Sequence, residues 1–68
     1  MYMEKEDSVI QIIGEYGIIK SVEQMHLDNG NKIGDKLIWY DVCLENGNGD
    51  IVYSCQKLKE ARKWAKEN

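Results

Sequence analysis

The sequence predicts a small α+β domain with the element order α-β-β-β-α, in which both helices pack on one face of an antiparallel three-stranded sheet. Three observations lead to this prediction: a β-hairpin signal over residues 37–55, an amphipathic stripe over residues 57–67, and helical spacing of apolar residues over 9–16. The 68 residues are enough for one domain, which we expect to occupy residues 8–68 after a short polar lead over residues 1–7.

The first predicted element is a helix that begins near Asp7 or Ser8, either of which can cap it. Its apolar positions recur at the spacing of one helical face: Val9, Ile10, Ile12, Ile13 and Tyr16. Gly17 suits the left-handed position that ends many helices. Four of these residues are β-branched and fit a strand as well, with residues 14–17 as a turn, but the helix is favoured.

The second element is a strand over residues 18–27. Its apolar residues fit neither period well, but the segment His26-Leu-Asp-Asn-Gly-Asn31 is spelled much like Cys43-Leu-Glu-Asn-Gly-Asn48. Because the second segment lies where a strand enters a turn, we expect the first to do the same. Residues 28–36 then form a long polar loop.

A β-hairpin follows, with strands over residues 37–44 and 51–55 around the polar loop 45–50. The loop contains two Asn-Gly pairs, which tolerate positive φ angles and are a strong hairpin signal. A turn centred on Gly47-Asn48 pairs Leu44 with Ile51, Val42 with Tyr53 and Tyr40 with Cys55.

Alternation along the two strands gives the hairpin two different faces. The face that we expect in the core has no charge: Ile38, Tyr40, Val42, Leu44, Ile51, Tyr53 and Cys55. The opposite face is mixed: Leu37, Trp39, Asp41, Cys43, Val52 and Ser54. We expect Leu37, Trp39, Cys43 and Val52 to contact a protein partner or a second copy of the chain. The alternative is that the chain's own N-terminal segment covers this face.

The last element is a helix over residues 57–67. Leu58, Ala61, Trp64 and Ala65 form one stripe, and most other positions are charged. A helix this short is not stable alone, so its stripe must pack on the apolar face of the hairpin.

Charge divides the chain into two parts. Residues 1–56 hold four lysines and ten acids, a balance of −6, whereas residues 57–68 carry a balance of +3. The sequence shows no secretory pattern and no long apolar run, so we expect a soluble cytoplasmic protein without membrane contact. The hairpin register points Cys43 and Cys55 to opposite faces, and we therefore expect two buried free thiols.

We expect no enzyme activity, no catalytic residue, no cofactor and no metal site. His26 is the only histidine, and a nucleophilic pair would require it to lie beside Cys43 or Cys55. The cysteines and the histidine do not follow a zinc-site spacing. A chain of this size also lacks room for a typical enclosed pocket.

The segment Lys57-Leu-Lys-Glu-Ala-Arg-Lys-Trp-Ala65 resembles the last helix of double-stranded RNA-binding domains. In that family the basic first turn of this helix contacts phosphates across a major groove. The resemblance implies that Lys57, Lys59, Arg62 and Lys63 would bind nucleic acid. Trp64 stands where the family usually has a small residue, and the acidic body would repel a polyanion, so RNA binding is the alternative function.

The last thirty residues, a short hairpin followed by the basic helix that ends at Asn68, resemble the ending of many small uncharacterised proteins of phages and prophages in low-GC bacteria. The resemblance implies a protein that binds a host protein or itself. The favoured prediction is therefore a non-enzymatic protein-interaction module that acts through a sheet face.

Overall fold

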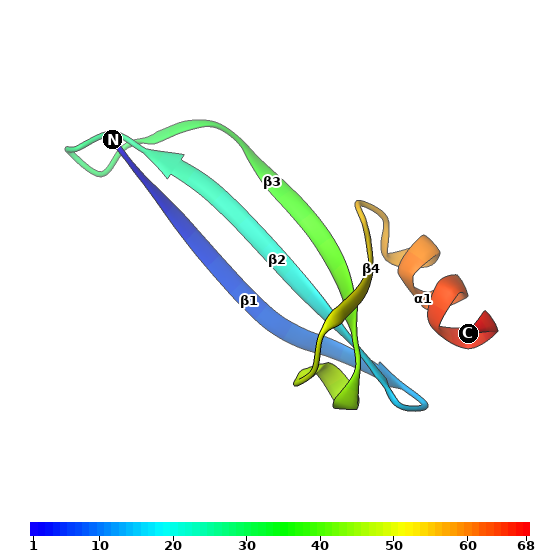
Figure 1. Ribbon diagram of the computed structural model, residues 1–68. Helices are drawn as coiled ribbons and strands as arrows, with labels where there is room; N and C mark the ends of the chain where they lie inside the picture. Colours follow the sequence, from blue (N-terminus) through cyan, green and yellow to red (C-terminus); the bar gives the residue numbers. More distant parts are fainter.

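The computed structural model describes residues 1–68 and contains one four-stranded antiparallel sheet with a single α-helix at the C-terminal end (Figure 1). The strands follow one another in the sheet in chain order. Their bounds are β1 Tyr2–Ile13, β2 Tyr16–His26, β3 Lys32–Cys43 and β4 Ile51–Cys55, with a short 3-10 turn η1 at Glu45–Gly47 and helix α1 at Leu58–Glu67. The α+β class is confirmed, but the predicted order of two helices and three strands is wrong.

The predicted N-terminal helix is a strand. β1 pairs along its length with β2, and residues 2–7, expected as a polar lead, form its first half. The β-branched residues near Val9 and Ile12 suit a pleated strand better than a helix. Gly14 has a φ of 59° in a two-residue turn that joins β1 to β2, the position that favours glycine in a tight hairpin. Gly17 is not a helix end but lies inside β2.

The predicted second strand is confirmed as β2, but the long loop expected over residues 28–36 is much shorter. The chain turns between Leu27 and Asn31, where the Leu27 amide donates to the Asn31 carbonyl at 2.8 Å. β3 then begins at Lys32, and Gly34 and Asp35 lie within the strand. The register between β2 and β3 shifts near Gln24. Gly34 and Asp35 therefore lie in a bulge of β3.

The hairpin register is confirmed at two of its three predicted pairs. Tyr40 pairs with Cys55 and Val42 pairs with Tyr53. The expected pairing of Leu44 with Ile51 is wrong, because a bulge in β4 brings Ile51 opposite Cys43 instead. The loop is wider than a two-residue turn, and η1 occupies it.

Helix α1 packs on one face of the sheet and forms the core there, as predicted. The buried residues are Ile18, Val42, Cys55, Ala61 and Ala65, and the half-buried side chains around them include Tyr40, Tyr53, Leu58 and Trp64. The Trp64 ring stacks on Tyr53, with ring centres 5.3 Å apart, and meets the edge of Tyr16. We call this side of the sheet the helix face and the other side the open face.

The core occupies one end of an elongated molecule that measures 44 by 20 by 15 Å. Three strands continue beyond α1 and β4 toward the N-terminus and the β2–β3 turn (Figure 1). We call this three-stranded extension, residues 2–8, 20–26 and 32–38, the arm. No helix covers the arm on either face, and every residue from 27 to 37 is exposed.

Candidate protein-interaction surface

The open face is a continuous surface of the sheet with no second layer over most of its length. Residues that pair directly in an antiparallel sheet point to the same side. Pairing therefore assigns each position of the face from the strand register. The exposed apolar residues on it are Met3, Val9 and Ile12 from β1, Met25 from β2, Ile33, Leu37 and Trp39 from β3, and Ile51 and Val52 from β4.

Three of the four predicted interaction residues lie at this surface. Leu37 is 43% exposed and Trp39 is 36% exposed, and they are neighbours on the open face of β3. Val52, at 39% exposure, lies on β4 next to Tyr53, which points to the helix face, so Val52 points to the open face. These side chains are large and apolar, and nothing in the chain covers them fully.

The prediction is wrong for the fourth residue, Cys43, because its side chain is buried and only 2% exposed. It pairs with Gly17, and η1 folds back over this pair. A side chain at Gly17 would come within 2.4 Å of the Asn46 backbone, and the Asn46 amide donates to the Glu15 carbonyl at 3.0 Å. Burial and the neighbouring Asp41 carboxylate raise the pKa of the Cys43 thiol above its ordinary value.

The sequence reasoning missed the contribution of β1 and β2 to this surface. The sequence predicts Met3 in a polar lead, Val9 in a helix and Met25 in a strand of the three-stranded sheet. The β-branched run of Val9, Ile10, Ile12 and Ile13 before a glycine turn was the signal that could have placed β1 in the sheet. Charged groups on the same face come from Lys5, Asp7, Glu23 and Asp41, and Asp41 accepts a hydrogen bond from the Ser54 hydroxyl at 2.7 Å.

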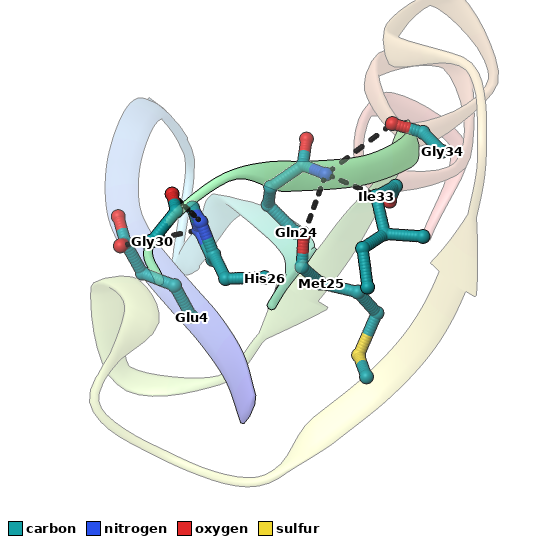
Figure 2. A network of polar contacts seen from close by, with 7 residues as sticks. All are labelled: Glu4, Gln24, Met25, His26, Gly30, Ile33 and Gly34. Carbon is teal, nitrogen blue, oxygen red and sulfur yellow. Dashed lines mark hydrogen bonds and ion pairs between the residues drawn. The ribbon is translucent and has the colours of Figure 1, made fainter. Parts of the chain in front are cut away.

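A polar cluster lies at the tip of the arm, on the helix face of the sheet (Figure 2). His26 is buried, its Nδ1 lies 3.3 Å from the Gly30 carbonyl, and its Nε2 lies 3.5 Å from a Glu4 carboxylate oxygen. The Tyr2 ring stacks on the imidazole, with centres 5.0 Å apart. Gln24 donates to the Ile33 carbonyl at 3.1 Å and so satisfies the bulge of β3.

These contacts give the cluster a structural role at the end of the sheet. The amino group of Met1 pairs with Asp28 in the adjoining turn, which attaches the start of β1 to the β2–β3 connection. A shallow hollow of about 300 Å³ beside the cluster is lined by two lysines, two glutamates, Val22, Gln24 and His26.

The structure does not bring His26 to either cysteine. Cys43 pairs with Gly17, near the opposite end of β2 from His26, a separation of about 30 Å at the usual strand rise. Cys43 and Cys55 are both buried free thiols, as predicted. No group of three or more His, Cys, Asp or Glu side chains is arranged to hold a metal ion.

The second predicted site, for nucleic acid, lies on the outer side of α1. Lys59, Arg62 and Lys63 line a shallow hollow of about 370 Å³ together with Lys66 and Glu67. Arg62 also donates from Nε to the Gln11 side chain on β1 at 2.7 Å. Lys57 precedes the first turn of the helix and does not line this hollow.

Comparison with known proteins finds no match among protein-family models, curated proteins or solved structures. None of the helices is long and apolar enough to cross a membrane.

Proposed function

We propose that this protein is a non-enzymatic interaction module that binds another protein or a second copy of itself through the open face of its sheet. The observation that supports the proposal is the row of exposed apolar side chains on that face, with Leu37 and Trp39 at its centre. Large exposed apolar side chains that gather on one face are typical of interaction sites. Trp is also one of the residue types enriched among the energetic centres of interfaces.

Burial of the open face against a partner should lower the free energy of the protein. Burying the exposed part of the Trp39 side chain would contribute on the order of 1–2 kcal/mol. Small domains have only a few kcal/mol of net stability, so this is a large fraction of the total. The same surface in an unbound chain would leave the arm with a single layer, which is a weak arrangement for a sheet.

Affinity capture from cells that express the protein tests the proposal, with three forms of the chain compared. Trp39→Ala removes the centre of the open face. Tyr2→Ala is the matched control, because Tyr2 is also an exposed aromatic residue of the arm but lies on the helix face. Each captured protein is then purified and its binding measured by titration calorimetry. We expect Trp39→Ala to abolish the binding and Tyr2→Ala to leave it intact.

Equal binding by both variants would contradict the proposal, as would a chain that binds neither itself nor any purified candidate. The resemblance of the C-terminal hairpin and helix to phage and prophage proteins supports a host protein as one candidate partner. Genes for phage or mobile-element proteins beside the coding sequence would support that origin.

Binding of double-stranded RNA through α1 is the second candidate function, because four cationic side chains gather around one hollow on that helix. A mobility-shift titration with duplex RNA tests it at low and moderate salt, since phosphate contacts weaken as salt rises. Binding that is lost in the double substitution Lys59→Glu and Lys63→Glu would support it. No shift at low salt would exclude it.

A further inference from the structure

We infer that the occupant of the open face is a second copy of this chain, packed face to face about a two-fold axis that crosses the strands. This inference rests on the proposed function and names its partner. The axis lies between two neighbouring rows of the sheet. One row is Lys5, Glu23 and Leu37, and the next row is Asp7, Ser21 and Trp39.

A single chain leaves the arm without a second layer. Residues 2–10 are all exposed, and only ten residues of the whole chain are buried, mostly at the helix end. A sheet gains its stability by packing a face against another layer. A second copy is the partner that is present in equal amount wherever the chain is made.

The molecule also has the dimensions that a dimer interface along the sheet requires. The molecule is 44 Å long and 20 Å wide, and the sheet extends along its length. Stable protein interfaces bury roughly 800 Å² of each partner. The open face is therefore large enough for a standard interface without any contribution from the helix face.

This axis makes the open face complementary to itself. A two-fold axis across the strands places β1 over the partner's β1 and reverses the order of the rows. Lys5 then lies over the partner's Asp7, and the symmetry repeats this pair of opposite charges. Leu37 lies over the partner's Trp39, which joins two large apolar groups next to the axis.

The rows farther from the axis agree with this arrangement. Met3 lies over the partner's Val9, and Met25 over the partner's Ile19, so apolar groups meet apolar groups. Asp41 falls beside the partner's Ile33, but its carboxylate already accepts the Ser54 hydroxyl. An axis along the strands would instead place Glu23 over the partner's Glu23, where like charges repel.

Size-exclusion chromatography with light scattering tests whether the chain is a dimer. We expect the mass of two chains at micromolar concentration, with a shift to one chain on dilution. Trp39→Ala should weaken the dimer at least about tenfold, as expected for a central aromatic residue. Tyr2→Ala should leave the dimer affinity unchanged. Circular dichroism of each variant shows that it is folded.

A charge exchange tests the position of the axis. Lys5→Glu alone and Asp7→Lys alone each place like charges across the axis, so each should weaken the dimer. The double substitution Lys5→Glu and Asp7→Lys restores opposite charges and should recover most of the lost affinity. Lys59→Glu on α1 is the matched control for charge reversal and should have no effect.

A monomer at every concentration would overturn the inference, as would a dimer that Trp39→Ala does not weaken. Failure of the double substitution to recover affinity would overturn the proposed axis. If the chain is a monomer but Trp39→Ala abolishes binding to a different purified protein, the second copy is excluded while the proposed function stands. If Trp39→Ala changes no interaction at all, both fail.

Discussion

Gly17 shows how one residue determines what the sheet can carry on its open face. The absence of a side chain lets η1 approach the sheet, and this approach buries Cys43 at the edge of the candidate surface. The sequence identified Gly17 as important but for the wrong reason, since a helix end and a close backbone approach both favour glycine. Only the contact with Asn46, distant in sequence, distinguishes them.

Gly17→Ala is expected to lower the free energy of unfolding by about 2 kcal/mol or more, because the new methyl group would overlap backbone atoms that cannot move independently. Urea denaturation measures the change. Gly14→Ala is the control: its methyl group would meet nothing, and only the strain of its positive φ, about 1 kcal/mol, applies. A loss no larger than that of the control would show that η1 does not pack on Gly17.

Because of the Cys43 thiol, we expect the free energy of unfolding to depend on pH. The pKa of this thiol in the folded chain is raised above its ordinary value, first by burial and then by the Asp41 carboxylate. The folded state therefore holds this proton more strongly than the unfolded state does. The contribution of the protonated Cys43 thiol to the free energy of unfolding is fully present below about pH 9 and declines as the pH rises further.

Urea denaturation under reducing conditions between neutral pH and pH 10 checks this dependence. The comparison is with Cys43→Ala, which should lose less stability over the same interval. The same loss in both proteins would contradict the assignment.

At the scale of elements, the sequence predicted the C-terminal half well and the N-terminal half poorly. The hairpin and α1 were predictable because turn chemistry and the stripe of Leu58, Ala61 and Trp64 point to the same structure. The segment over residues 9–13 satisfies both the helical and the strand patterns, and its pairing with β2 decides between them. The loop over residues 28–36 looked irregular because a bulge at Gly34 hides the strand pattern.

Helix α1 depends on Trp64 for its attachment to the sheet. Trp64→Ala should lower the free energy of unfolding by about 2–3 kcal/mol, below the cost for a fully buried Trp because the ring is half-buried between Tyr53 and Tyr16. Thermal unfolding followed by circular dichroism measures it, and helical signal should be lost first. Lys63→Ala on the exposed side should change stability by less than about 0.5 kcal/mol. Equal effects would contradict this packing.

At the scale of the whole molecule, the core is concentrated at one end and the arm extends from it. Sequence reasoning predicted which face of the hairpin lies under the helix, and it placed Leu37, Trp39 and Val52 on the other side. It could not predict the length of the surface, because β1 was read as a helix. The extent of the open face depends on pairing between Met3, Met25 and Ile33, which are far apart in the sequence.

This asymmetry is the physical reason for expecting self-association. A chain with its core at one end leaves a long single layer that a second copy would complete. The Trp39 side chain should therefore report on self-association. Its environment should change when two chains associate, while that of Trp64 should not. Both indoles can be observed together by fluorine NMR after incorporation of fluorotryptophan, with the two signals assigned from Trp39→Phe.

The most direct measurement is the fluorine signal of Trp39 over a dilution series in ordinary and heavy water. We predict that it changes position on dilution and gains the isotope shift of a solvent-exposed indole, while the Trp64 signal stays constant. A Trp39 signal that is solvent-exposed and unchanged at every concentration would contradict the claim that a second copy covers the open face.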